Sequence, residues 1–175
     1  ASDIPIILFT YFNPVHYMGI EQFVAEAADS GVDGALVLDL PPEESKEYKA
    51  LMDMKDLCTV YLLAPTSTDD RIDLISRFST GFVYYVSREG VTGMREQMSG
   101  GVDSMVEKIR SRSGSPVAVG FGISDSDMAA EVASYADAVV VGSAIVKKIG
   151  EKGDRPDLIE HVSRFVSQLV KAVKR

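Results

Sequence analysis

The stretch Val117-Ala118-Val119-Gly120-Phe121-Gly122-Ile123-Ser124 carries a short apolar run straight into two glycines and a serine, a residue type that often starts helices. Glycine weakens the interior of a strand, so its presence here indicates that some group approaches the bare backbone closely. Comparable apolar runs recur along the chain, at residues 4–10, 34–38, 58–63, 82–86, 116–120 and 137–141. Because these runs are apolar throughout, they predict strands covered on both faces, as in a parallel sheet.

Helical patterns separate the predicted strands. The pairs Ser67/Asp70 and Ser124/Asp127 have the spacing of a capping box, which predicts that helices start at these serines. An earlier apolar stripe ends before Gly31, which suits a helix C-cap, and the last helix is predicted to open at Pro156-Asp157. The apolar positions are Ile20, Phe23, Val24 and Ala27 in the first stripe, and Leu158, Val162, Phe165, Leu169 and Val173 in the last helix.

About six βα units in one domain, residues 1–175, leave two architectures: an open doubly wound sheet, or part of a (β/α)8 barrel. A doubly wound sheet often carries the motif G-x-G-x-x-G after its first strand. That motif does not follow residues 4–10, and the glycine-rich strand ends fall late in the chain, where a barrel builds its phosphate site. The sequence therefore favours an incomplete (β/α)8 barrel, of the TIM-barrel type.

The composition is that of an ordinary globular protein, with 46% hydrophobic and 25% charged residues. The net charge of −8 argues against a broad nucleic-acid or anionic-membrane surface, although helix amides can still bind an anionic small molecule. The sequence has no apolar run of membrane-spanning length and no signal-peptide pattern in its first residues. Cys58 is the single cysteine and the two histidines form no cluster, so we expect a reduced, cytoplasmic protein without a metal.

Three glycine-rich loops follow the later predicted strands, at residues 87–93, 120–124 and 142–146. Glycines remove the Cβ atoms that would block a dianion, while unpaired first-turn amides and the helix dipole attract it. Each loop taken singly is also typical of a tight turn followed by a capped helix. Two such loops on successive strands, after a third, predict a phosphate site at the carboxyl ends of the strands.

The sequences of these loops resemble those of the tryptophan synthase alpha chain family. The similarity extends over essentially all 175 residues and is most specific in Ser87-Arg88-Glu89-Gly90-Val91-Thr92-Gly93 followed by Gly120-Phe121-Gly122-Ile123-Ser124; residues 5–14, 38–44 and 142–146 match as well. The resemblance implies a (β/α)8 barrel and a lyase of tryptophan biosynthesis that cleaves indole-3-glycerol phosphate to indole and glyceraldehyde 3-phosphate by a retro-aldol reaction. It also implies no cofactor on this chain, because pyridoxal phosphate belongs to the beta chain that receives the indole.

The resemblance further implies roles for residues at matching positions. Those expected to bind phosphate are Gly93, Gly122, Gly142 and Ser143. Those expected to line the substrate pocket are Phe9, Tyr11, Leu63, Tyr84, Thr92 and Phe121, and those expected at the interface with the beta chain are Asn13, Asp39 and Pro41. From the residues alone, Tyr84, Phe9 and Leu63 suit a core as well, and Asp39 suits a cap for a helix that starts at residues 41–43.

The family pattern has two further βα units ahead of the strand predicted at residues 4–10, and the resemblance places the catalytic glutamate and aspartate of the family there, before Ala1. We therefore expect no catalytic residue within residues 1–175, where Asp39 is the best-placed carboxylate, and an isolated chain that is inactive. A barrel without two strands exposes edges at residues 4–10 and 138–141, so we expect a distorted sheet, self-association, or a place in a longer chain. The alternatives are another phosphate-binding barrel, an isomerase or a synthase, and a non-catalytic remnant that binds phosphate compounds.

Overall fold

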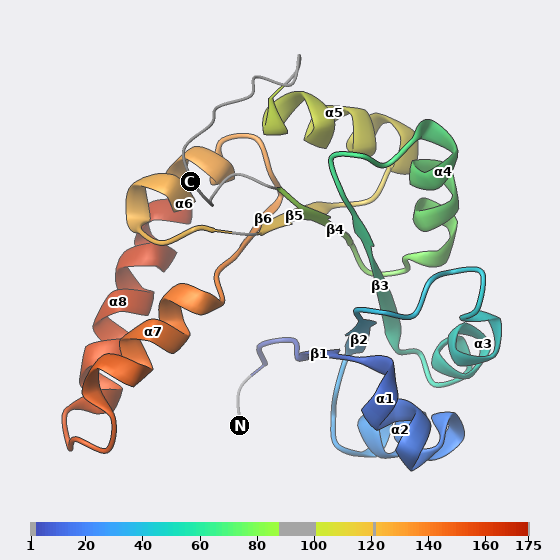
Figure 1. The fold of residues 1–175 in the computed structure, drawn as a ribbon, viewed down its shortest axis with the longest axis horizontal. Helices are drawn as coiled ribbons and strands as arrows, with labels where there is room; N and C mark the ends of the chain where they lie inside the picture. The colour runs from blue at the N-terminus through green and yellow to red at the C-terminus, as the bar shows by residue number, and fades with distance from the viewer. Residues whose placement is uncertain (1–2, 88–100, 121, 175) are drawn as a thin grey trace.

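Six parallel strands lie side by side in sequence order in the computed structural model, which describes residues 3–87, 101–120 and 122–174 (Figure 1). Each of the predicted apolar runs contains one of these strands, and every neighbouring pair is parallel, which confirms the predicted sheet. The strands are β1 (Ile7–Thr10), β2 (Gly34–Val37), β3 (Cys58–Leu63), β4 (Val83–Val86), β5 (Val117–Gly120) and β6 (Ala138–Val140).

Helices cover the outer side of the sheet, so that they form an arc around the strands in Figure 1. The helices are α1 (Phe12–Met18), α2 (Ile20–Asp29), α3 (Lys46–Met54), α4 (Asp69–Phe78), α5 (Val102–Ser113), α6 (Ser126–Ala133), α7 (Ser143–Lys152) and α8 (Leu158–Val173). Helix α8 contacts both α6 and α7. Among the helices described, none has the length and apolarity that crossing a bilayer requires.

The core lies between the sheet and this helical layer. One cluster is buried beneath α4 and α5, a second beneath α1 to α3, and a smaller one between α6 and α8. Full burial of an aliphatic side chain contributes about 1.5–3 kcal/mol each, so these clusters supply the main stabilising term. Fully buried members include Val15, Val24, Met52, Ile72, Ile75, Val83, Val106, Ile109, Val117 and Val119.

The opposite face of the sheet is concave. Phe9 of β1 and Tyr84 of β4 meet edge-to-face with ring centroids 6.3 Å apart, although β2 and β3 separate their strands. Neighbouring strands are about 4.8 Å apart, so a flat sheet would hold β1 and β4 roughly 14 Å apart. The contact indicates that the sheet curls, and within the described residues it forms a half-barrel with free edges at β1 and β6.

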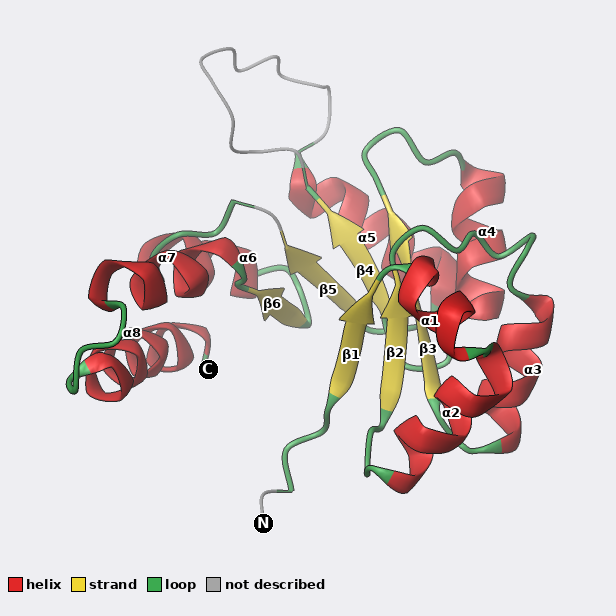
Figure 2. Cartoon of the chain, turned by 60° about the horizontal axis from the view of Figure 1, so that its bottom comes forward, coloured by secondary structure: helices red, strands yellow, loops and turns green. Residues whose placement is uncertain are grey.

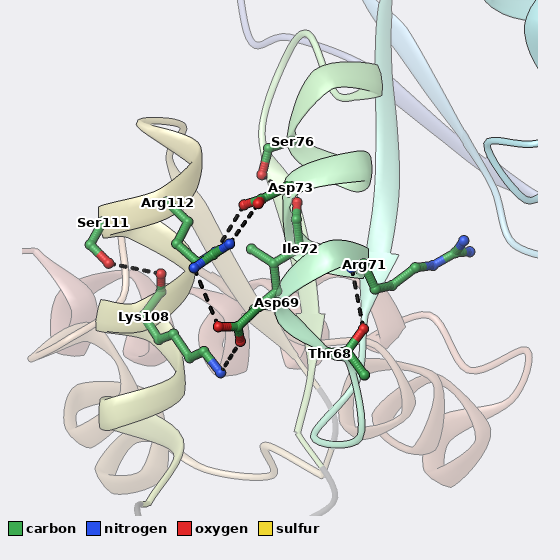
Figure 3. Close-up of polar contacts among 9 residues, drawn as sticks. All are labelled: Thr68, Asp69, Arg71, Ile72, Asp73, Ser76, Lys108, Ser111 and Arg112. Atoms are coloured by element: carbon green, nitrogen blue, oxygen red, sulfur yellow. Dashed lines mark hydrogen bonds and ion pairs between the residues drawn. The ribbon is translucent and has the colours of Figure 1, made fainter.

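Ion pairs join α4 to α5 on the outside of the barrel (Figure 3). The Arg112 guanidinium reaches both carboxylate oxygens of Asp73, at 2.8 and 2.5 Å, and Lys108 Nζ lies 2.5 Å from Asp69 Oδ1. Arg112 also lies 3.3 Å from the second oxygen of Asp69. Hydrogen bonds from these cations lower the pKa of Asp69 and of Asp73, so both carboxylates stay charged well into acid.

The two helix starts predicted at serines each lie one residue later. Thr68 caps α4, its Oγ1 accepting from the Arg71 amide at 3.3 Å, because Ser67 Oγ already accepts from the Ala64 amide. Asp125 caps α6, while Ser124 donates to the Asp125 carboxylate. The predicted opening of the last helix is confirmed, because α8 has Asp157 at its N-cap position.

Candidate functional site

The carboxyl ends of the strands lie at one edge of the sheet (Figure 2), and several of the predicted site residues directly follow these ends in the chain. Tyr11 and Asn13 follow β1, Asp39 and Pro41 follow β2, Gly122 follows β5, and Gly142 and Ser143 follow β6.

Some of the predictions fall outside the described residues. Thr92, Gly93 and Phe121 are three of them. The catalytic glutamate and aspartate that the resemblance places before Ala1 are not among residues 1–175, so the structure does not test where they lie. The part of the chain that the structure does describe holds no group of three His, Cys, Asp or Glu residues arranged to bind a metal.

The start of α7 is an open, positively polarised helix end. Gly142 is the N-cap residue and Ser143 the first helical residue, and the first turn of α7 contains no acidic residue. Ser143 is exposed, and a Cβ placed on Gly142 would meet nothing within 4 Å. The Ile145 and Val146 amides donate to the Gly142 carbonyl, but the two amides ahead of them have no acceptor within the helix, so this end can receive an anion in hydrogen-bond contact with the backbone.

The start of α6 differs, because a carboxylate already occupies it. Asp125 Oδ1 accepts from the amides of Asp127 and Met128 at 3.1 and 2.9 Å. The bond from the Met128 amide holds the pKa of Asp125 below its ordinary value, so the cap is negatively charged at neutral pH. The expectation that a helix starting at Ser124 offers its first amides to phosphate is therefore wrong, and exposed Gly122, with φ +78°, is what this loop presents.

Gly120 lacks a side chain because the Tyr84 phenol lies against it. A Cβ at Gly120 would lie 2.2 Å from the Tyr84 hydroxyl oxygen and 2.8 Å from Cζ. Burial raises the pKa of this phenol, so Tyr84 presents a neutral hydroxyl at physiological pH. The group that approaches the backbone at Gly120 is thus a neighbouring side chain on the concave face, which also holds the exposed ring of Phe9.

Leu63 does not reach the concave face. It is 1% exposed and belongs to the core cluster on the helix side, together with Tyr85, its register partner on β4. Leu62 is the register partner of Tyr84 and shares its face of the sheet. The run CTVYLL is nearly apolar throughout and shows no polar/apolar alternation, so the sequence does not predict which of its two leucines faces the concave side.

The loops after β1 and β2 are tied together by Asp39. Its Oδ1 accepts from the Phe12 amide at 2.6 Å, which places a carboxylate at the start of α1. Asp39 therefore caps α1 rather than a helix at residues 41–43, and α3 begins later, at Lys46. The bond fixes Tyr11, the N-cap residue of α1, beside the loop that carries Asp39 and Pro41. Tyr11 is 58% exposed, so much of its side chain is open to solvent at this edge of the barrel.

Comparison with known families decides which barrel this is. The family model described as tryptophan synthase alpha chain matches residues 1–174. The chain belongs to this family. Tryptophan synthase alpha chains are lyases of tryptophan biosynthesis built on a (β/α)8 barrel, so the curved six-stranded sheet is part of a TIM barrel, as the sequence predicts.

Curated relatives are longer than this chain. The tryptophan synthase alpha chain of Geotalea daltonii is 48% identical over 168 residues, which cover 96% of this chain and 63% of the relative. That of Geotalea uraniireducens is 49% identical over 174 residues, which cover 99% and 64%. The chain thus spans just under two thirds of the length of the relatives that it matches.

A solved structure shares the architecture as well. The chain superposes on a chain from the tryptophan synthase a2b2 complex of Pyrococcus furiosus with a TM-score of 0.84 at 40% identity. The match covers 97% of this chain and 68% of the other. A structure from Aquifex aeolicus gives the same TM-score and identity, covering 99% and 63%.

Proposed function

We propose that this chain supplies the phosphate- and indole-binding part of a tryptophan synthase alpha chain, whose reaction is the retro-aldol cleavage of indole-3-glycerol phosphate to indole and glyceraldehyde 3-phosphate. Two observations carry the proposal: an open helix start after β6 and an aromatic pair on the concave face of the sheet. The helix start is that of α7, at Gly142 and Ser143, and the aromatic pair is Phe9 with Tyr84.

The phosphate is proposed to sit at the start of α7. Its oxygens would accept hydrogen bonds from the first-turn amides and from the Ser143 hydroxyl, while the helix dipole favours the negative charge. The space beside Gly142 is open to receive it. Gly122 would supply a second amide from the neighbouring loop, and Gly93 is proposed as a third contact through the family resemblance.

The indole is proposed to lie against the aromatic pair on the concave face. Phe9 is 61% exposed and Tyr84 half-buried, so a planar ligand can cover both rings and gain the free energy of apolar burial. Leu62 joins this surface by its register with Tyr84. Tyr11, Thr92 and Phe121 keep their proposed places in the pocket by resemblance to the family.

Cleavage needs an acid to protonate the indole carbon and a base to remove the proton of the glycerol hydroxyl. Three carboxylates in these loops already have structural partners: Asp39 caps α1, Glu43 pairs with Arg71, and Asp125 caps α6. We therefore propose that residues 1–175 alone bind the substrate without turning it over, the catalytic carboxylates of the reaction lying elsewhere in a complete alpha chain.

The partner is proposed to be a tryptophan synthase beta chain, which would carry the pyridoxal phosphate and receive the indole. Its docking surface would include Asn13, Asp39 and Pro41, which share one rim after β1 and β2. The related Pyrococcus furiosus chain comes from an a2b2 complex, which supports a partner of this kind. The reaction belongs to tryptophan biosynthesis, for which we propose the cytoplasm as the location.

Calorimetric titration with three ligands tests the proposal. Indole-3-propanol phosphate, an analogue that cannot be cleaved, should bind at least about tenfold more tightly than inorganic phosphate or ribose 5-phosphate, because it alone fills both halves of the site. Tighter binding of ribose 5-phosphate would favour a different phosphate-binding barrel. Release of indole from indole-3-glycerol phosphate by the isolated chain would contradict the proposed lack of turnover.

A further inference from the structure

Ser45 is the last residue before α3 and has the position of a helix N-cap, yet its hydroxyl does not cap the helix. The side chain is fully buried, and its Oγ donates to the Pro42 carbonyl at 3.1 Å. The same Oγ accepts from the Tyr61 hydroxyl of β3 at 2.6 Å. A serine at this position ordinarily bonds to the first amides of its helix, so its hydroxyl is diverted here to the turn that precedes the helix.

The turn held in this way is short and stiff. The Glu44 amide donates to the Pro41 carbonyl at 3.0 Å, and the Ser45 amide donates to the Pro42 carbonyl at 3.2 Å. The Pro42 carbonyl therefore accepts from both the amide and the hydroxyl of Ser45. Both prolines have a fixed φ, which removes much of the freedom of this segment. On its outer side the turn is tied to α4, because Glu43 pairs with Arg71.

Tyr61 reaches the turn from inside the core. Its side chain is only 4% exposed, and burial raises the pKa of its phenol, so the hydroxyl keeps its proton and donates. A desolvated hydroxyl is costly unless it has a partner, and Ser45 is the partner. Tyr48, in the core cluster beneath α1 to α3, offers a contrast. It is 2% exposed, and its buried hydroxyl has no hydrogen-bond partner among the described residues.

We propose that the Tyr61 hydroxyl, acting through Ser45, is a positioning group for residues 41–45 and thereby for the partner-binding rim that contains Asp39 and Pro41. The identity of the partner in this proposal rests on the proposed function, whereas the hydrogen-bond network is independent of it. Tyr61 is not expected to touch the partner, because it lies beneath the turn. Its effect on docking would come from keeping the turn in one conformation before the partner arrives, which lowers the ordering cost of binding.

Three single variants of the full 175-residue chain test this role. Tyr61→Phe and Ser45→Ala remove the two hydroxyls of the network, and Tyr48→Phe removes a buried tyrosine hydroxyl from the neighbouring core cluster. Hydrogen exchange of the Glu44 and Ser45 amides reports how well the turn is held. Affinity for a tryptophan synthase beta chain reports docking, and urea unfolding reports global stability.

Tyr61→Phe is expected to speed exchange of the two amides about fivefold to tenfold, as loss of one buried hydrogen bond allows, and Ser45→Ala, which also removes the bond to the Pro42 carbonyl, by at least as much. They should weaken binding of the beta chain by a similar factor, and the double variant should be no worse than Ser45→Ala alone, because that substitution already removes both bonds of the network. Tyr48→Phe should change neither quantity by more than about twofold.

The outcomes separate the network from the identity of the partner. If the wild-type chain does not bind the beta chain, the proposed partner is wrong, and amide exchange alone decides whether Tyr61 holds the turn. If Tyr61→Phe exchanges like Tyr48→Phe, the positioning role is overturned even where the wild type binds. Faster exchange with unchanged binding overturns the link to docking.

Discussion

The Tyr84 phenol fills the space beside Gly120 that any larger residue would need. Gly120→Ala would place its Cβ within 2.2 Å of the phenol oxygen, so either the ring or the end of β5 must move. We expect this substitution to lower the free energy of unfolding by about 1–3 kcal/mol, the usual cost of overpacking. Urea unfolding followed by circular dichroism measures the change.

Two further variants give this prediction its controls. Tyr84→Ala removes the obstructing ring, so Gly120→Ala should cost markedly less in that background than in the wild type. Gly150→Ala adds a methyl group within α7 where nothing lies within 4 Å, and should be neutral or stabilising. Equal costs for Gly120→Ala with and without the Tyr84 ring would show that the phenol is not what requires the glycine.

At single positions, the sequence predicts reliably that a residue has a close contact or a capping role, but it does not predict which group is the partner. The glycines at 120 and 122 indicate a close approach to the backbone, but the Tyr84 ring that reaches Gly120 comes from the neighbouring strand. The capping role of Asp39 is likewise evident from its type, whereas its target, the Phe12 amide, lies 27 residues earlier. Such partners depend on strand register, which a single sequence leaves open.

At the scale of elements, the ion pairs between α4 and α5 carry a pH-dependent part of the stability. Because the pKa of Asp69 and of Asp73 is lowered in the folded state, their contribution is fully present above the ordinary value of 3.8 and is lost as pH falls through the lower folded values. Arg112→Gln should therefore lower the free energy of unfolding near neutral pH. The difference in this free energy between the variant and the wild type should become smaller below about pH 4.

Urea unfolding of Arg112→Gln and the wild type across this pH range checks the expectation. High salt should narrow the difference as well, because the pairs are partly exposed. Arg164→Gln is the matched control, since Arg164 pairs with Glu160 one turn away in the same helix, α8. A difference for Arg112→Gln that stays constant from neutral pH to acid would exclude the carboxylate pairs as its cause.

The secondary structure could be predicted because its signals are local. Each apolar run contains a strand, and the apolar stripe before Gly31 forms α2. The chain turns away from the end of α2 at Gly31, which has φ +77°. The start of α6 lies one residue later than predicted because Ser124 and Asp125 are both good caps, and only the Asp125 carboxylate reaches two amides. The face of Leu63 could not be predicted, since both leucines at the end of β3 are apolar.

At the scale of the whole molecule, the half-barrel leaves apolar surface uncovered. Ile4 and Ile6 are exposed ahead of β1, and a groove of about 520 Å³ between α7 and α8 is lined by Ile149, Leu158, Ile159, Val162 and Val166 together with Ser163 and Ser167. Free strand edges and exposed apolar patches favour association. The 175-residue chain is therefore predicted to self-associate as its concentration rises, and more so in salt, which screens the net charge of −8.

Sedimentation velocity over a wide concentration range measures this association. The weight-average sedimentation coefficient should rise with concentration in the wild type. Ile159→Lys, on the open side of the groove, should reduce the rise, whereas Glu160→Lys, on the neighbouring exposed position, should not. A monomer at all concentrations and salt levels would mean that the exposed edges and the groove do not drive association.

The central claim is that the start of α7 holds the phosphate of an indole-bearing substrate. Calorimetric titration of indole-3-propanol phosphate into the wild type, Gly142→Ala and Gly150→Ala tests it most directly. The free protein has room for a methyl group at both glycines, but at Gly142 the group would enter the space assigned to the phosphate. We predict that Gly142→Ala weakens binding by about tenfold or more while Gly150→Ala binds like the wild type. Equal affinity for all three proteins would contradict the account.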